Sequence, residues 1–330
     1  MEANAPSGGP RLLEIVRSAI RARQLSRRTE EAYTGWIRRY VRFWGMRHPG
    51  ELDGRDVERF LSHLANDHDV STSTQNQAAS ALLFLYREVL HTELEIPPDV
   101  VRPKKPRRLP VVMTRAEIVG VFPELSGTYR LIAALLYGAG LRLMEGLELR
   151  VKDVELERRE IIVREGKGGY DRKVMLPEAA RAELGRQLGR VRELHDRDVQ
   201  RGTGWVELPG AFARKSPGAA RELAWQWLFP ALRHYTDAAT GQRRRHHLHE
   251  SAVQREVRAA VRRAGIPKRA TCHTFRHSFA THLLEDGCNP EHVRILMGHK
   301  SLRTTMQYLH VLNEGRSVIR SPLDRLDFRI

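Results

Sequence analysis

Residues 273–284 read HTFRHSFATHLL and residues 296–308 read LMGHKSLRTTMQY. In the first stretch, a gap of three positions would place His273 and Arg276 on one face of a helix, while apolar residues such as Phe279 can face a core. A guanidinium is a planar fork that matches two phosphate oxygens, and a histidine can transfer protons near neutral pH. The pair suits phosphoryl transfer, although H-x-x-R by itself is more often a surface or capping pair.

Arg142 and Lys167 are two further candidates for the same chemistry. Arg142 follows Gly140, where an apolar helix predicted from Tyr129 ends. Glu145 lies three residues after Arg142, and we expect it to form a helical i,i+3 pair rather than to act in catalysis. Lys167 lies among glycines that permit the positive φ angles of a hairpin turn. Strand-like runs lie on both sides of this turn, at residues 160–163 and 173–176.

The second stretch adds His299 and, nine positions later, Tyr308. An arginine, a hairpin lysine, H-x-x-R, G-H and a tyrosine, in this order and spacing, resemble the catalytic set of tyrosine recombinases. The matching positions are Arg142, Lys167, His273, Arg276, His299 and Tyr308. A tyrosine here could instead be a packed core residue, but its register after the G-H pair favours a nucleophile.

The resemblance implies a mechanism. Tyr308 would attack the scissile phosphate and give a 3′-phosphotyrosine and a free 5′-hydroxyl. The two arginines would bind the phosphate, Lys167 would protonate the leaving oxygen, His273 would assist proton transfer, and His299 would hydrogen-bond a phosphate oxygen. Because the phosphotyrosine conserves the energy of the broken phosphodiester, rejoining should need neither ATP nor a metal. No cofactor is expected.

The chain also resembles the integron integrase subgroup, over roughly residues 102–326. The segments that carry this resemblance are RPKKPRRLPVVMT, LLYGAGLRLMEGLELRVKDV, GKGGYDR, WQWLFP, RRRHHLHES and TCHTFRHSFATHLL. The most diagnostic is an insertion over about 225–250, before the H-x-x-R helix, which resembles one that Xer-type and phage integrases lack. Leu309 and Gly146 depart from the familiar pattern, but the catalytic atoms stay in place.

The expected fold is mainly α with two domains. A helical SAM-like core-binding domain is predicted over residues 1–98, and an α-rich catalytic domain with a small antiparallel β-sheet over 112–330. The basic linker predicted between them, 99–111, overlaps the segment IPPDVVRPKKPRRLP at 96–110, whose five prolines exclude a helix. The tail over about 310–330 would dock on a neighbouring subunit, as the resemblance implies, or be a frayed terminus.

Charge and composition agree with a nucleic-acid partner. Lys+Arg number 56 against 40 Asp+Glu, which leaves a formal charge of +16 and a pI near 10.4. Such a charge favours a polyanion, although a solvated basic surface or anionic lipid would fit charge alone. Cys272 and Cys288 lack the spacing of a disulfide framework or zinc site, so we read them as structural. Without a membrane-spanning run or signal peptide, the chain is expected to be cytoplasmic, bacterial and nucleoid-associated.

Aromatic and basic residues of the insertion and linker are the expected DNA contacts. They are Trp225, Arg244, Arg245, His246, His247, Lys104, Lys105 and Arg107. The resemblance implies that Trp225 stacks on a base extruded from folded single-stranded DNA, with His246 or His247 bonded to or stacked on it. Trp225 or Trp227 could instead pack in the core, and the linker could be only a soluble tether. The histidines lack partners at zinc-site spacing, so no metal is expected.

Together these observations predict an integron integrase that integrates and excises gene cassettes. The expected partners are double-stranded attachment sites, folded single-stranded cassette sites, and three further copies in a homotetramer on two DNA sites. Two alternatives stay open. A Xer-type or phage-type recombinase would act on duplex sites and leave the insertion as a surface feature. A DNA-binding regulator without activity would have no need for all six catalytic positions.

Overall fold

The computed structural model describes residues 12–94, 110–164, 171–210 and 212–308. The chain forms two compact units, Met1–Arg108 and Leu109–Ile330. Each is considered by itself. The basic linker lies almost wholly outside the described residues, so the predicted domain boundaries stay predictions.

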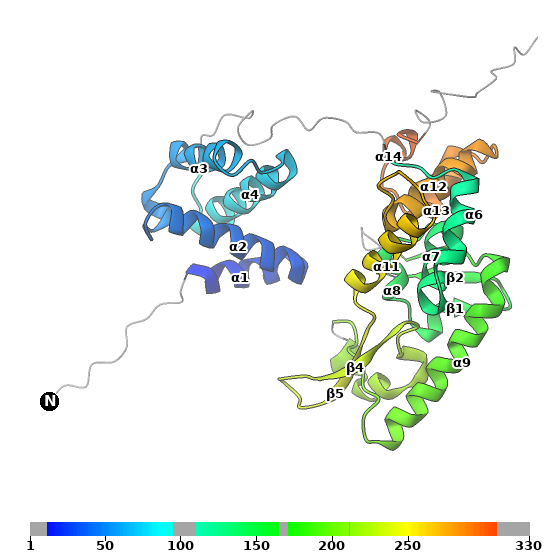
Figure 1. Cartoon of the computed structure of the whole chain (residues 1–330). Helices are drawn as coiled ribbons and strands as arrows, with labels where there is room; N and C mark the ends of the chain where they lie inside the picture. Colours follow the sequence, from blue (N-terminus) through cyan, green and yellow to red (C-terminus); the bar gives the residue numbers. More distant parts are fainter. Residues whose placement is uncertain (1–11, 95–109, 165–170, 211, 309–330) are drawn as a thin grey trace, which may run out of the picture. The chain divides into compact units, whose positions relative to one another are not determined.

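The N-terminal unit is a bundle of helices, coloured blue to cyan in Figure 1. Its elements are α1 Leu12–Ala22, α2 Arg27–Phe43, the 3₁₀ turn η1 Pro49–Glu51, α3 Gly54–Asn66, α4 Thr72–Phe84 and the π-helical segment η2 Leu85–Leu90. The side chains of Ser26, Asp53 and Ser71 accept hydrogen bonds from the first turns of α2, α3 and α4, which explains where these helices begin. The helical character predicted for this part of the chain is confirmed over its described residues.

Apolar faces of the four helices meet in one core. Ile37, Leu61 and Leu82 are fully buried in it. Two buried tyrosines add a polar link, because the hydroxyls of Tyr40 and Tyr86 lie 3.0 Å apart and Tyr86 donates to the carbonyl of Pro49 over 2.8 Å. Both polar groups are therefore satisfied inside the core.

The C-terminal unit is also mainly helical. Its α-helices are α6 Arg115–Val121, α7 Gly127–Gly138, α8 Leu143–Leu147, α9 Glu178–Gln200, α10 Phe212–Lys215, α11 Glu250–Arg263, α12 Cys272–Glu285, α13 Pro290–Met297 and α14 Leu302–Met306. Short 3₁₀ turns are η3 Phe122–Glu124, η4 Val151–Asp153, η5 Pro217–Arg221 and η6 Leu223–Trp225. A capping box opens α6, because the side chains of Thr114 and Glu117 accept hydrogen bonds from each other's backbone N–H groups.

Helix α12 crosses the middle of this unit. It packs against α7, α11 and α13, and most of its residues are buried around the whole circumference. The long helix α9 covers another side of α7 (Figure 1). This packing fixes α12, and the H-x-x-R pair with it, relative to the turn that follows α7.

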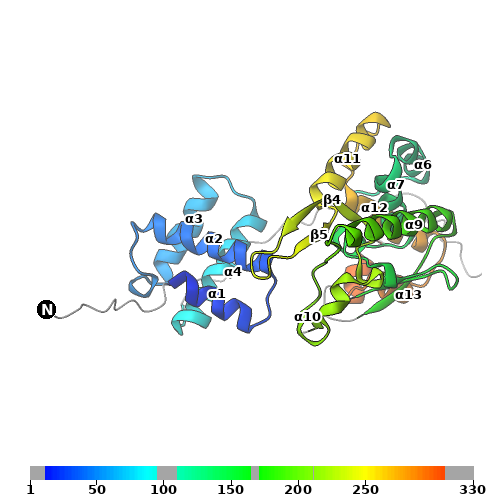
Figure 2. The ribbon, with the colours of Figure 1, turned by 90° about the horizontal axis from the view of Figure 1, so that it is seen from below.

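Two small antiparallel sheets complete the unit. Strands β1 Val154–Glu155, β2 Glu160–Val163 and β3 Arg172–Met175 form the first, with Val163 opposite Arg172. The second consists of β4 Pro230–Thr236 and β5 Arg243–His247, a hairpin that extends from the helical body in Figure 2. The predicted insertion over 225–250 contains this hairpin.

In the parts of the chain that the structure describes, none of the helices combines the length and the apolar character needed to cross a membrane.

Candidate active site

Arg142 is positioned by the turn after α7. Gly140 has a φ of +64°, and a Cβ there would lie 2.4 Å from the ring of Phe279, so both conformation and space require glycine. Arg142 then caps the start of α8, and its Nη2 donates to the carbonyl of Gly298 over 3.3 Å. Its side chain is 23% exposed, so the guanidinium is accessible to an anion from solvent.

Arg276 lies beneath Arg142, on α12, with a side chain only 3% exposed. Its Nη1 and Nη2 donate to the carbonyls of Gly140 and Met297. Burial and, second, the charge of Arg142 lower the pKa of Arg276 to about 9, which leaves it protonated at neutral pH. The two predicted phosphate-binding arginines are therefore held side by side as cations.

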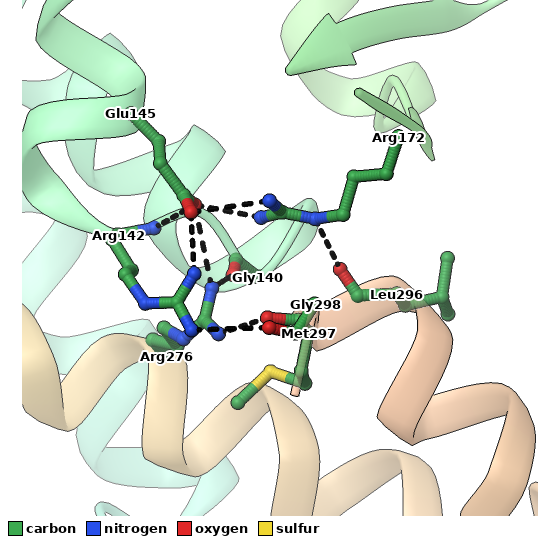
Figure 3. A network of polar contacts seen from close by, with 8 residues as sticks. All are labelled: Gly140, Arg142, Glu145, Arg172, Arg276, Leu296, Met297 and Gly298. Carbon is green, nitrogen blue, oxygen red and sulfur yellow. Dashed lines mark hydrogen bonds and ion pairs between the residues drawn. The ribbon is translucent and has the colours of Figure 1, made fainter. Parts of the chain in front are cut away.

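Glu145 joins these arginines to a third one, Arg172 of β3 (Figure 3). Its Oε1 accepts from Nη1 of Arg142 at 2.5 Å, and its Oε2 lies 3.5 Å from Nη1 of Arg276. Arg172 forms a two-pronged pair with it, at 3.1 and 2.6 Å. Burial opposes ionisation of Glu145, but the hydrogen bond and charge of Arg172 lower its pKa to about 2. The pairing expected between Glu145 and Arg142 is present, within a larger network.

The sequence interpretation missed Arg172 because 27 residues separate it from Glu145. One signal was available. Arg172 and Val174 alternate with exposed residues along β3, so both face inward. An inward arginine needs a buried partner, although the sequence could not say which carboxylate would supply it.

Two histidines from the predicted set flank the arginines. His273 lies in the first turn of α12 and retains access to solvent; partial desolvation and then the charge of Arg276 lower its pKa. His299 is 8% exposed, and its Nδ1 lies 2.9 Å from the hydroxyl of Thr305. Burial and the neighbouring arginines lower the pKa of His299 to about 3. His299 is therefore neutral at physiological pH.

Tyr308 is 2% exposed and contacts two histidines. Its ring stacks with that of His299 at a centroid distance of 6.2 Å, and its hydroxyl lies 2.9 Å from Nδ1 of His277. Burial raises the pKa of Tyr308, and the charges of Arg276 and Arg142 act against this. The sequence interpretation gave His277 no role. Its place four residues after His273 on one helix was the available signal.

This arrangement brings together a phenol, three imidazoles and a cationic site for an anion, all from α8, α12 and the α13–α14 region. A phenol needs a base and a site that spreads the charge of a phosphorane, and both are chemically present. Lys167, the sixth predicted catalytic residue, lies outside the described residues.

Two family models match the chain. Residues 113–314 match the phage integrase family, and residues 12–96 match the N-terminal SAM-like domain of phage integrases. The chain belongs to the phage integrase family. Its mainly helical fold, with two domains and small antiparallel sheets, is the fold predicted from the sequence.

Relatives of this phage integrase include an integrase/recombinase from Escherichia coli, 47% identical over 321 residues that cover 97% of this chain and 95% of the relative. The tyrosine recombinase XerA of Thermococcus kodakarensis is 33% identical over 290 residues, 87% of this chain and 86% of XerA. These matches identify the chain as a tyrosine site-specific DNA recombinase.

Solved structures share the fold. The XerH site-specific recombinase bound to difH substrate, in a pre-cleavage complex, has a TM-score of 0.61 at 20% identity and covers 95% of this phage integrase and 86% of XerH. The Tn1549 transposon integrase in complex with transposon right end DNA has a TM-score of 0.60 at 17% identity, covering 90% and 94%. At these identities the likeness concerns the fold.

The segment predicted to be an insertion, over about 225–250, borders a pocket of about 590 Å³ that is lined by Trp225 and Trp227. Trp225 stacks on Phe212 at 4.7 Å, and the ammonium of Lys152 lies 2.8 Å from its ring centroid. Trp227 is 7% exposed and donates to the carbonyl of Arg245, so it has the core role expected of one of the pair. The half-buried Trp225 is the better placed of the two for a base.

The remaining predicted DNA contacts of this phage integrase differ in exposure. His246 is exposed at the pocket, whereas His247 is 6% exposed. Arg244 is half-buried and donates to Asp237 in the hairpin turn. Arg245 needs a correction: it is 6% exposed, and both its Nε and Nη2 donate to Asp198 at 2.8 Å. It holds the hairpin to α9 and is unavailable to DNA. The linker residues Lys104, Lys105 and Arg107 lie outside the described residues, as does the tail over 310–330.

Proposed function

We propose that this recombinase is an integron integrase in which Tyr308 is the nucleophile and Arg142 and Arg276 bind the scissile phosphate. The observation that carries the chemistry is geometric: Arg142 and Arg276 converge on Glu145, and the hydroxyl of the buried Tyr308 lies 2.9 Å from Nδ1 of His277. The ring of His299 stacks on the ring of Tyr308. These contacts support the roles that the resemblance implies for these residues.

In the cleavage step, the phenolic oxygen of Tyr308 forms a bond to phosphorus as the bond from phosphorus to the 5′-oxygen breaks. The phenolic proton leaves to a base, and Lys167 supplies a proton to the 5′-oxygen. Arg142 and Arg276 balance the charge that develops on the phosphorane oxygens. A second 5′-hydroxyl then attacks the phosphotyrosine, which forms a new phosphodiester and releases Tyr308. One phosphodiester is formed for each one broken, so no nucleotide is consumed.

The proton of Tyr308 has a candidate acceptor in His277, at 2.9 Å. Burial and then the charge of His273 lower the pKa of His277 to about 4, so it is neutral at physiological pH and can accept. His273 lies next in line, with its ring centroid 5.0 Å from that of His277. We assign His277 the direct contact and His273 the relay toward solvent.

The integron assignment depends on the insertion. Its pocket has room for a planar base and combines Trp225 and His246 with the cations Arg150 and Lys152. Aromatic rings and cations together bind unpaired bases through stacking and charge. This supports recognition of bases extruded from a folded single-stranded cassette site. Arg244 and the linker residues Lys104, Lys105 and Arg107 would contact the DNA backbone.

Duplex recognition, as in Xer-type enzymes, is the second candidate. A relative named tyrosine recombinase XerA favours it. In that case the β4–β5 hairpin would be a surface feature. The inactive regulator is the weaker reading, because a regulator does not need a buried tyrosine bonded to a histidine beside two arginines.

In the cell we propose a homotetramer on two DNA sites, one of them a double-stranded attachment site, with the tail over 310–330 docked on a neighbouring subunit. The corresponding location is the bacterial cytoplasm, in association with the nucleoid.

The test uses a labelled single-stranded cassette hairpin with a nick just past the cut site, and the perfect duplex of the same sequence. Wild type, Tyr308→Phe and Trp225→Ala are mixed with each DNA without metal or nucleotide. Covalent adducts that resist SDS are then counted. We expect the wild type and Trp225→Ala to form adduct and Tyr308→Phe to form none. The wild type should form more adduct on the hairpin than on the duplex, and Trp225→Ala should show no such preference.

Adduct from Tyr308→Phe would overturn the nucleophile. Equal trapping of hairpin and duplex by the wild type would overturn the integron assignment and favour the Xer-like alternative. If the wild type traps neither DNA, the proposed activity on cassette sites is wrong.

A further inference from the structure

Arg172, the last residue of the GKGGYDR segment, links three parts of the active site although the sequence interpretation gave it no role. It is the first residue of β3, and its side chain is 10% exposed. Two of its nitrogens donate to Glu145 of α8, and Nε donates to the carbonyl of Leu296 at the end of α13 over 3.0 Å (Figure 3). All three nitrogens of the guanidinium are thus engaged by protein groups.

Gly298 shows how closely Arg172 packs against the end of α13. This glycine ends the helix with a φ of +58°, and a Cβ there would lie 3.0 Å from Nη1 of Arg172. The carbonyl of Gly298 accepts from Arg142, and His299 follows directly. Arg172 therefore supports the backbone that carries both a contact of Arg142 and the histidine stacked on Tyr308.

The acceptor capacity of Glu145 is filled by two arginines. A carboxylate has about four lone-pair sites. Arg172 occupies two of them, and Arg142 occupies two through Nη1 and its backbone N–H. Arg276, at 3.5 Å, is held instead by the carbonyls of Gly140 and Met297.

An anion beside two phosphate-binding arginines is a competitor of the phosphate. Carboxylate and phosphate both accept a guanidinium through paired hydrogen bonds. Without Arg172, two acceptor sites of Glu145 would open, and Arg142 or Arg276 could turn toward them. The site would also lose one positive charge, because two guanidinium groups instead of three would then surround the one carboxylate.

We propose that Arg172 is a positioning residue: by filling two acceptor sites of Glu145 it prevents further pairing of Arg142 and Arg276 with this carboxylate, and so keeps their remaining N–H groups available to the scissile phosphate. The inference rests on the proposed role of these two arginines. Arg172 acts through Glu145 and touches no reacting atom. It keeps the positive charge of Arg142 and Arg276 available to stabilise the transition state, and it takes no part in recognition of the DNA sequence.

The test measures single-turnover formation of covalent adduct on the nicked DNA that the wild type cleaves. The variants are Arg172→Ala, Arg172→Lys and the double variant Arg172→Ala/Glu145→Gln, all in the full chain. We expect Arg172→Ala to bind this DNA within about threefold of wild type but to form adduct about 30-fold more slowly, below the loss typical of a direct contact to the developing charge. Lysine, which lacks the fork, should restore only part of the rate.

The double variant separates positioning from structure. Glutamine at 145 is nearly isosteric but carries no charge to compete with phosphate. If Arg172 acts by occupying Glu145, the double variant should form adduct about tenfold faster than Arg172→Ala alone. No gain, or a further loss, would overturn the proposal and indicate that Arg172 only supports the fold or contacts DNA itself.

A neutral substrate gives a second readout. Replacing the scissile phosphate by a methylphosphonate removes one anionic oxygen and so reduces the need for the arginine pair. The penalty of Arg172→Ala should then shrink from about 30-fold to a few-fold. An equal penalty on both substrates would overturn the proposal, because a misfolded site would slow both.

Two controls keep the outcomes distinct. Arg263→Ala removes an arginine that bridges Glu124 and Glu256 elsewhere in the same unit, and it should leave the rate unchanged. Arg276→Ala should abolish adduct formation if the proposed phosphate site is right. If Arg276→Ala forms adduct, the proposed phosphate site is wrong. If Arg276→Ala forms none but Arg172→Ala forms adduct at the wild-type rate, only the inference on Arg172 is wrong. If Arg172→Ala unfolds, Arg172→Lys decides by the same two comparisons.

Discussion

At the scale of single residues, the site combines permanent cations with neutral histidines. Arg142, Arg172 and Arg276 surround one carboxylate, so a net positive charge is left for an anion. Burial lowers the pKa of both His299 and His277. Arg276, Arg142 and Arg172 lower that of His299 further, and His273 and Arg276 lower that of His277 further. Two imidazoles are thus kept in the form that can accept a proton from Tyr308 or a hydrogen bond.

The first prediction concerns His277. Glutamine at this position can hold the tyrosine hydroxyl but cannot take its proton, so His277→Gln should slow adduct formation about 100-fold. The wild-type rate should stay flat from about pH 8 to pH 5, because the acceptor becomes protonated only as pH approaches its pKa of about 4. Single-turnover rates across pH check both statements.

The control for this prediction is His292→Gln, on the exposed side of α13, which should keep the wild-type rate. A wild-type rate that falls through pH 6.5 would contradict the prediction, since that is the pKa of an ordinary histidine.

The second prediction concerns stability. The pKa of His299 is lowered to about 3 by burial and by Arg276, Arg142, Arg172 and His277, whereas the unfolded chain has an ordinary pKa near 6.5. Below that value the unfolded state binds a proton that the folded state does not. The free energy of unfolding should therefore be level above about pH 7 and fall as pH drops from 6.5 toward 3, by up to about 1.4 kcal/mol per pH unit for this group.

Urea unfolding between about pH 7.5 and 4.5 measures this slope. His299→Gln should reduce it, and an unchanged slope would show that His299 is not held neutral. Glu145 adds a separate loss at lower pH, because its folded pKa of about 2 lies below the ordinary value for glutamate.

At the scale of elements, the site lies where three helix ends meet. Carbonyls after the end of α7 and at the end of α13 accept hydrogen bonds from Arg276 and Arg142. At the start of α8, the carboxylate of Glu145 accepts from the backbone N–H of Arg142. Glycines at 140 and 298 permit the left-handed turns that bring these ends together. Arg172 of strand β3 connects two of these ends, because it donates hydrogen bonds to Glu145 of α8 and to the carbonyl of Leu296 in α13.

The third prediction tests the Gly140 turn. Gly140→Ala should lower the free energy of unfolding by about 1–3 kcal/mol, because φ of +64° strains an alanine and its Cβ would overlap Phe279. Adduct formation should fall further than stability alone explains, since Arg142 and Arg276 both depend on this turn. Denaturant unfolding and adduct rates are measured together.

The matched control is Gly189→Ala on α9, where a Cβ would meet nothing and the backbone is helical. This change should raise stability by up to about 1 kcal/mol and leave the rate alone. Gly140→Ala with wild-type stability and rate would show that the turn is not required.

At the scale of the whole molecule, two compact units share a strongly basic chain with a formal charge of +16. Each unit has its own apolar core, so each can present a preformed surface to DNA. Affinity of this kind is dominated by counterion release from the phosphates.

The fourth prediction follows from that charge. Binding to nicked site DNA should weaken about 10³-fold when salt rises from about 50 mM to about 200 mM, as for proteins with six or more phosphate contacts. Tyr308→Phe, which keeps every charge, should show the same slope in mobility-shift titrations. An affinity that changes less than threefold would contradict a binding mode dominated by phosphate contacts.

Local patterns in the sequence were sufficient for the helices and their starts. The gap of three positions between His273 and Arg276 predicted α12, and an apolar run ending at Gly140 predicted α7. Glycines flanked by strand-like runs predicted the pairing of β2 with β3. The order of Arg142, H-x-x-R and Tyr308 indicated the family, which the family models confirm. These signals are readable because each depends on residues a few positions apart.

Only the tertiary structure decided which side chains share a contact across long stretches of chain. Arg172 meets Glu145, Arg245 meets Asp198 instead of DNA, and Tyr308 meets His277. The sequence could not assign these pairs, because many cations and carboxylates could satisfy one another until packing fixes their distances. Burial, which sets the charge state of each histidine and the accessibility of each arginine, is likewise a property of the folded chain alone.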